Sequence, residues 1–226
     1  MRRVLTVFRT TVGLKVLMAV TGALFILYVI AHMMGNLKAF QGPEKFNAYA
    51  EFLREVGYPV LGHSQFLWIV RIVLIGAVAI HVVAALALTR MSWRARPVGY
   101  HRSLEPDAST YASRTMRWGG LLLFAFVTYH LMHLTTGSAH PDFVANSAYH
   151  NVVTGFKVWW AAAVYIVMMI VLGLHLYHGL WSGLRTLGAH GPVFERWRRP
   201  VSAVIAVAIV AGFIAVPVGV LMGVIE

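Results

Sequence analysis

Residues Ala161–Arg185 read AAAVYIVMMIVLGLHLYHGLWSGLR, and this stretch decides the fold. It is an apolar run long enough for a helix that crosses a bilayer, which takes about 20 residues. It nevertheless carries two histidines, His175 and His178, near one end. A histidine within hydrocarbon is costly, so by default it indicates a function. The first question about the rest of the chain is therefore which other apolar runs carry histidines.

The composition is that of an integral membrane protein. Of 226 residues, 59% are hydrophobic and 12% are charged, whereas soluble domains are about half apolar and a quarter charged. The chain has no cysteine, which excludes disulfides, cysteine-ligated iron–sulfur clusters and thiolate ligation of a metal, and leaves histidine as the main metal ligand. The net charge of +11 does not indicate a nucleic-acid partner, because the basic residues lie in short loops between apolar runs, where they set membrane topology.

Five segments reach the length of a membrane span, and no second domain follows from the sequence over residues 1–226. Backbone groups in lipid must be satisfied within the segment, and these runs are too long for barrel strands. We therefore expect an all-α membrane protein with five transmembrane helices. The expected spans are about 16–34, 66–89, 118–135, 158–184 and 201–225.

The basic residues predict the orientation of these spans. Fourteen of the nineteen lysines and arginines fall on one side of the membrane. The positive-inside rule then places the N-terminus in the cytoplasm and the C-terminus outside. The residues on that inner side are Arg2, Arg3, Arg9, Lys15, Arg90, Arg94, Arg96, Arg102, Arg114, Arg117, Arg185, Arg196, Arg198 and Arg199.

The first loop is the longest on the expected outer side, and its middle predicts a short amphipathic helix. The sequence PEKFNAYAEFLREVG places apolar residues at helical spacing, and Gly57 and Pro59 follow. We expect this helix, over about 43–56, to lie on the outer membrane interface.

Three further spans carry histidines. Once the orientation of a span is known, the position of a residue in the sequence gives its depth in the membrane. At a rise of 1.5 Å per residue, His81 lies about 13 Å from Arg90, and His175 lies about 15 Å from Arg185. On the same measure His130 is about 18 Å from Trp118, and His32 is about 26 Å from Lys15. Two layers result. In the outer layer His32 faces His130 or His133, and in the inner layer His81 faces His175 or His178.

Two neutral imidazoles on facing helices are the ligands of a six-coordinate b-type haem, so four helices form a haem-binding bundle in this interpretation. Both axial positions are then filled, and electron transfer is the natural role. Small residues near the histidines would let a flat group approach closely; they are Ala77, Ala84, Ala85, Gly179 and Ser182. A single histidine in a span can instead form a hydrogen bond between helices or relay a proton. The loop histidines His63, His101, His140, His150 and His190 are expected to be solvated or interfacial.

Several motifs resemble one family, the single-chain, five-helix, di-haem cytochrome b subunit of succinate:quinone oxidoreductases (succinate dehydrogenase and fumarate reductase, complex II). The motif HLYHGLWS from His175 is the most specific, and the resemblance extends over nearly the whole chain in helix number, orientation and histidine order. The other motifs are TTVGLKVLMAVTG, AHMMGNL around His32, PEKFNAYA in the first loop and VTYH ending at His130.

The resemblance implies one ligand set. His81 and His175 would hold the proximal haem near the cytoplasm, and His32 and His130 the distal haem. Lys15 and Arg185 would be partners of the haem propionates. Arg71, a few residues inside the second span, would be a snorkelling interface residue, a propionate partner or part of a quinone pocket.

The resemblance also implies partners and a location. A flavoprotein subunit with covalent FAD would oxidise succinate in the cytoplasm, and an iron–sulfur subunit on the basic face would pass electrons to this chain. The chain would anchor the complex in the bacterial cytoplasmic membrane, with no carboxylate chemistry of its own, and would reduce a quinone, typically menaquinone, near the outer side. The complex could form a higher oligomer. Because the fourth span has no acidic residue, Glu51 and Glu55 are the nearest candidates for quinone protonation.

Two alternatives remain open at this point. The first is a di-haem cytochrome b subunit of another respiratory enzyme, such as nitrate reductase, formate dehydrogenase or hydrogenase. Ligands spaced 49, 49 and 45 residues apart, one on each helix, favour the succinate family over cytochromes with two ligands on one helix. The second is a haem-free anchor or transporter, which the lack of acidic residues and of paired broken helices disfavours.

Overall fold

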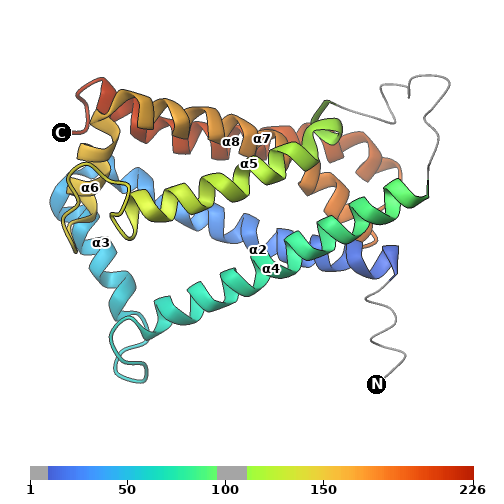
Figure 1. Ribbon diagram of the computed structural model, residues 1–226, viewed down its shortest axis with the longest axis horizontal. Helices are drawn as coiled ribbons and strands as arrows, with labels where there is room; N and C mark the ends of the chain where they lie inside the picture. Colours follow the sequence, from blue (N-terminus) through green and yellow to red (C-terminus); the bar gives the residue numbers. More distant parts are fainter. Residues whose placement is uncertain (1–9, 96–110) are drawn as a thin grey trace.

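The computed structural model describes residues 10–95 and 111–226, and these residues are helical with no β-strand. The basic residues expected at positions 2, 3, 9, 96 and 102, and His101, lie outside the described residues. The described elements, shown in Figure 1, are α2 (Thr11–Leu37), the 3-10 helix η1 (Lys38–Gln41), α3 (Pro43–Glu55), α4 (Gln65–Arg94), α5 (Tyr111–Leu134), α6 (Ala148–Lys157), α7 (Trp159–Thr186) and α8 (Pro192–Leu221).

Four helices, α2, α4, α7 and α8, are long and apolar enough to cross a membrane. This is the pattern of a multi-pass membrane protein. The helix α5 covers the third expected span with 24 residues, but it is not among the four. Its apolar character is lower because it includes Arg117, two glycines, His130 and His133. Its crossing of the membrane therefore stays a prediction.

Helix boundaries differ from the expected spans where polar residues continue a helix beyond its apolar part. The helix α2 begins at Thr11, and the Thr10 side chain caps it by accepting a hydrogen bond of 3.1 Å from the Gly13 backbone N–H. The helix α8 begins at Pro192, nine residues before the expected start, because proline fits the first turn and Glu195 lies there too. The helix α6 was not expected from the sequence.

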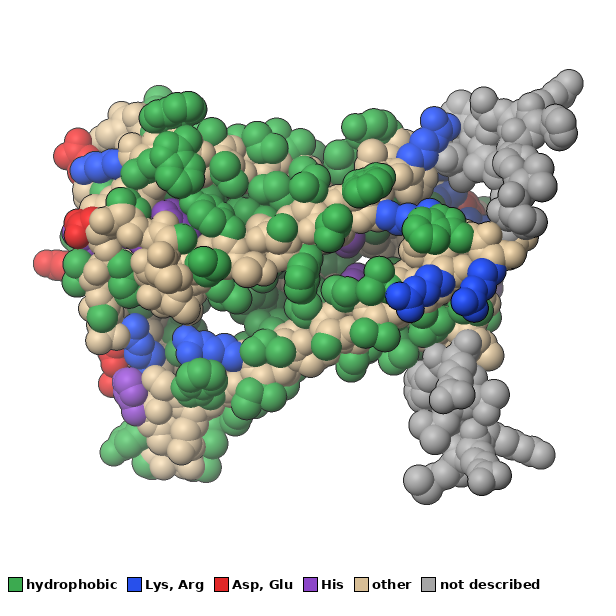
Figure 2. Space-filling view, in the orientation of Figure 1, with side chains coloured by type: hydrophobic (Ala, Val, Ile, Leu, Met, Phe, Trp, Pro, Cys, Tyr) green, Lys and Arg blue, Asp and Glu red, His purple; other side chains and the backbone are tan. Residues whose placement is uncertain are grey.

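The arrangement of the long helices is an open arc rather than a closed ring. The helix α2 packs against α4, α7 and α8, and α5 packs against α7. Along the arc the order is α4, α2, α7, α5, with α8 covering α2 and α7 from the other side. Figure 2 shows a face hollowed between α4 and α5, with histidine side chains visible in the hollow. The four helices that border this hollow are the four that carry the span histidines.

The two ends of the bundle differ in charge. We call the end where α4 and α7 end and α5 and α8 begin the basic end, because arginines gather there (Figure 2). We call the opposite end, with α3 and α6, the acidic end, since most acidic side chains in view lie there. The described basic-end residues are Lys15, Arg90, Arg94, Arg114, Arg117, Arg185, Arg196, Arg198 and Arg199.

Candidate histidine site

Four span histidines meet in two pairs. The ring centroids of His81 (α4) and His175 (α7) are 6.4 Å apart, and we call these residues the inner pair because they lie toward the basic end. The ring centroids of His32 (α2) and His130 (α5) are 5.9 Å apart, and these form the outer pair. The resemblance implied these two pairings, and the structure brings the two rings of each pairing together.

Each pair bridges helices that are not neighbours in the arc. The inner pair joins α4 to α7 past α2, and the outer pair joins α2 to α5 past α7. The two pairs are therefore the two diagonals of the four-helix arc. A group held between the rings of each pair would contact all four helices.

The spacing of the rings fits one metal ion between the two imidazoles of each pair. Metal–imidazole bonds of about 2 Å on opposite sides of an ion put the ring centres about 6 Å apart. Among the described residues, no group of three or more His, Cys, Asp or Glu side chains could hold a bare ion. A haem requires only two protein ligands, because its macrocycle supplies the other four. Each histidine pair thus has the number of imidazoles that one haem takes from the protein.

In the inner pair, Thr21 of α2 determines which nitrogen of His81 is free. Thr21 Oγ1 has one hydrogen, and it donates this hydrogen to the Leu17 carbonyl at 2.7 Å. The same oxygen lies 2.8 Å from Nδ1 of His81, so it must accept there. His81 therefore carries its hydrogen on Nδ1, and its Nε2 has the lone pair that a metal ion needs.

Glycines border both rings of the inner pair. A Cβ atom on Gly22 would lie 3.8 Å from Cε1 of His81, and a Cβ atom on Gly120 would lie 3.8 Å from Cε1 of His175. A Cβ atom on Gly179 would meet nothing within 4 Å in the described residues. Glycine at these positions leaves room for a flat group beside both rings.

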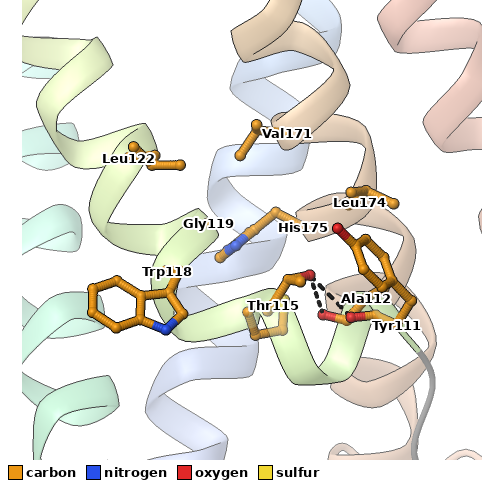
Figure 3. Close-up of a pocket in the computed structure, with 10 residues that line it drawn as sticks. Tyr111, Ala112, Thr115, Trp118, Gly119, Leu122, Val171, Leu174 and His175 are labelled. Carbon is orange, nitrogen blue, oxygen red and sulfur yellow. Dashed lines mark hydrogen bonds between the residues drawn. The ribbon is translucent and has the colours of Figure 1, made fainter.

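A cavity of about 180 Å³ opens beside His175 between α5 and α7. Figure 3 shows the His175 ring reaching from α7 toward Gly119 of α5. His175 Nδ1 is buried and has no hydrogen-bond partner among the described residues. The other residues around the cavity are Tyr111, Ala112, Thr115, Met116, Trp118, Leu122, Val171 and Leu174.

The outer pair lies among aromatic side chains instead of glycines. The His32 ring stacks on Tyr28 at 5.5 Å and lies 5.9 Å from Phe213 of α8. Nδ1 of His130 lies 3.3 Å from the Tyr165 hydroxyl of α7. If Nδ1 of His130 is the donor in this hydrogen bond, its Nε2 keeps the lone pair that a metal ion needs.

The structure separates the two histidines of each doublet. His133 is 1% exposed, and its ring stacks on Tyr129 and on His140 of the following loop. His178 packs edge-on against Trp181, with 4.9 Å between the ring centroids. Of the four histidines in the two doublets, only His130 and His175 have a ring contact with a histidine of another long helix in the described residues.

On three helices, the residues near the inner pair and those near the outer pair are separated by nearly the same distance along the helix axis. Thr21 and His32 are eleven residues apart on α2, which is about 16 Å. Gly120 and His130 on α5, and Tyr165 and His175 on α7, are ten residues apart, or about 15 Å. The residues that serve each pair therefore lie at consistent depths on helices that run in opposite directions.

The expected cationic residues lie outside the pairs. Lys15 and Arg185 are exposed at the basic end, and Nε of Arg185 is 3.9 Å from Oε1 of Glu195 on α8. Arg71 is exposed and lies over the Trp68 ring at 4.9 Å. It lies ten residues before His81 on α4, which is about 15 Å along the helix toward the acidic end. Arg71 therefore belongs to the outer layer.

Several residues of the site did not follow from the sequence. The sequence analysis assigned no role to Thr21 or Tyr165, although Thr21 lies eleven residues before His32 and so on the same face of α2. His140 was expected to be solvated or interfacial. It is partly buried against His133, and its Nε2 lies 2.8 Å from the Asn151 carbonyl of α6.

The comparisons with known proteins identify no family for this chain. No protein-family model, no curated protein and no solved structure matches the chain.

Proposed function

We propose that the chain is a five-span cytochrome b that binds two b-type haems, the membrane-anchor subunit of a succinate:quinone oxidoreductase. The observation that carries this proposal is the presence of two imidazole pairs on the diagonals of one four-helix arc. The further assignment to the succinate family rests on the sequence motifs around His32, His130 and His175.

The residues of the chain would hold each haem from both faces. His81 and His175 would ligate the inner haem, and His32 and His130 the outer haem, through Nε2. A haem with two histidine ligands takes up and releases one electron and has no free position for oxygen. Thr21 and Tyr165 would orient the ligands, while Gly22, Gly120 and Gly179 would give space for the macrocycle. Lys15, Arg185 and Arg71 are candidate propionate or quinone contacts.

The charge of the basic end supports an orientation and partners. Under the positive-inside rule this end faces the cytoplasm, so the chain would lie in the bacterial cytoplasmic membrane with α5 as its third span. An iron–sulfur subunit bearing acidic residues would dock there and deliver electrons from a flavoprotein subunit that oxidises succinate. The chain itself would have no carboxylate chemistry.

A quinone, with menaquinone the first candidate, would react near the outer pair. Support comes from a cavity of about 540 Å³ at the acidic end, lined by Phe52, Glu55, Tyr58 and His63. Aromatic and ionisable side chains together suit a ring that gains protons when it is reduced. Glu55 in this cavity is therefore a better candidate proton donor than Glu51, which bonds His63 and Arg54.

A dithionite-reduced minus oxidised spectrum of the purified chain, with haem quantified, tests the proposal. We expect about two low-spin b haems per chain. Absence of haem would leave a histidine-bearing anchor or transporter and would reject the electron-transfer function. If the chain binds two haems but is isolated from membranes without a flavoprotein, it is a cytochrome b, and the subunit is assigned to another respiratory enzyme.

A further inference from the structure

Two histidines of α5 share one hydroxyl group. The Tyr165 hydroxyl lies 3.1 Å from Nδ1 of His133 and 3.3 Å from Nδ1 of His130. Tyr165 is 6% exposed and His133 is 1% exposed. The hydrogen bond to His133 is thus buried, and the hydrogen bond to His130 is partly buried.

The chemistry of a phenol allows only one arrangement of hydrogens at a time. The Tyr165 hydroxyl has one hydrogen to donate and accepts with its oxygen. If it donates to Nδ1 of one imidazole, the other neutral imidazole must donate its own Nδ1–H to the oxygen. The histidine that donates from Nδ1 has a free lone pair on Nε2, whereas the histidine that accepts at Nδ1 carries its hydrogen on Nε2. When the hydroxyl donates to one of the two imidazoles, that histidine cannot be an Nε2 metal ligand, and the other histidine can.

We propose that Tyr165 is the positioning residue that decides which histidine of α5 serves the outer pair. It accepts from Nδ1 of His130 and donates to Nδ1 of His133. His130 is then the Nε2 ligand, and His133 is kept in the tautomer that cannot bind a metal ion through Nε2. This inference rests on the proposed haem ligation and adds a residue outside the ligand set.

The surroundings of the two rings favour this direction of the hydrogen-bond chain. The His130 ring faces His32 across the arc, where a lone pair on Nε2 can be used. The His133 ring lies between Tyr129 and His140 with its faces covered. His140 is also fixed, because its Nδ1 accepts from the Asp142 N–H at 3.0 Å and its Nε2 therefore donates to the Asn151 carbonyl. His133 thus packs against a neutral neighbour and faces no second span histidine.

The chain offers a matched control for Tyr165→Phe. Tyr129→Phe makes the same change at the residue directly before His130, in a tyrosine whose ring stacks on His133. The Tyr129 hydroxyl has no hydrogen-bond partner among the described residues, so this variant alters aromatic packing only slightly and removes no bond to a histidine. A second variant, His133→Phe, keeps the stacked ring but removes the acceptor that holds the Tyr165 hydrogen.

The first measurement is nitrogen-15 NMR of histidine in the haem-free full chain in lipid nanodiscs. We expect opposite tautomers, with hydrogen on Nδ1 of His130 and on Nε2 of His133. Tyr165→Phe should abolish this difference at His130, and Tyr129→Phe should retain it. The same tautomer at both histidines of the unaltered chain would overturn the proposal.

The second measurement is haem titration in the His175→Ala background, which isolates the outer pair. We expect Tyr165→Phe to weaken binding by about 10-fold or more, the usual effect of losing a hydrogen bond to a metal ligand. His133→Phe should weaken binding in the same direction, although His133 is not a ligand. Equal affinities for Tyr165→Phe and Tyr129→Phe would reject the positioning role. If the unaltered chain binds no haem, the proposed function fails, and the NMR measurement still decides whether the hydroxyl is shared as described.

Discussion

The inner and outer pairs have nearly the same ring spacing but are built in different ways. His81 is oriented by Thr21, whose own hydrogen bond returns to its helix backbone, and both inner rings border glycines. His130 is oriented by Tyr165 on another helix, within an aromatic cluster. The inner pair therefore depends on a hydroxyl that is held by its own helix backbone and on glycine neighbours, whereas the outer pair depends on a hydroxyl within an aromatic cluster. Substitutions should affect one pair without the other.

The largest expected effect separates the two pairs completely. His175→Ala should remove the inner haem and leave the outer one, so that haem content falls from about two to about one per chain. His178→Ala is the matched control on the same helix, because His178 contacts Trp181 rather than a span histidine. Reduced-minus-oxidised spectra with haem quantification measure both variants. Two haems in His175→Ala would refute the inner assignment.

A smaller effect tests the local support of the inner pair. Thr21→Val keeps the shape of the side chain but removes the oxygen that accepts from Nδ1 of His81. Loss of such a partner should weaken the inner haem by about 10- to 100-fold and leave the outer haem unchanged. Competition for haem with an apo-globin measures the change in affinity. Thr128→Val is the control, since Thr128 is exposed on α5 and bonds only the Phe124 carbonyl; an equal loss there would show that Thr21 has no special role.

The sequence predicted the depth of each pair better than the way each is held. Apolar length and histidine spacing placed His32 with the α5 histidines and His81 with the α7 histidines, because a helix converts residue number directly into distance along its axis. Hydropathy could not find α6, a ten-residue helix too short to span, nor the polar first turns of α8. It also could not assign Tyr165 a role, because a hydroxyl shared by two side chains depends on the angle between α5 and α7.

The aromatic cluster of the outer layer also contains a hydroxyl that the site does not use. Tyr129 stacks on His133, and its buried hydroxyl lacks a hydrogen-bond partner among the described residues. Because a buried unpaired hydroxyl destabilises the folded state, Tyr129→Phe should raise the free energy of unfolding by about 1 kcal/mol. Thermal unfolding in detergent measures this change. A lower melting temperature would show that the hydroxyl has a partner. A different variant would then be needed as the control for Tyr165→Phe.

The smallest expected effect is a pH dependence confined to the acidic end, remote from the inner pair. The pKa of Glu51 is lowered, chiefly by the hydrogen bond from His63 and next by the one from Arg54. Because the folded pKa lies below the unfolded value of about 4.3, ionised Glu51 stabilises the fold above that pH, and this contribution disappears as the pH falls through the folded pKa.

His63→Ala should bring the Glu51 pKa back toward its usual value. The control His150→Ala removes another histidine–carboxylate pair at this end, with Asp142, and should leave Glu51 unchanged. Carboxyl NMR titration distinguishes the two variants, and an equal response would mean that His63 is not the cause. Since Glu51 is fully exposed, neither variant should change either haem spectrum, and a spectral shift in His63→Ala would instead link this loop to the outer pair.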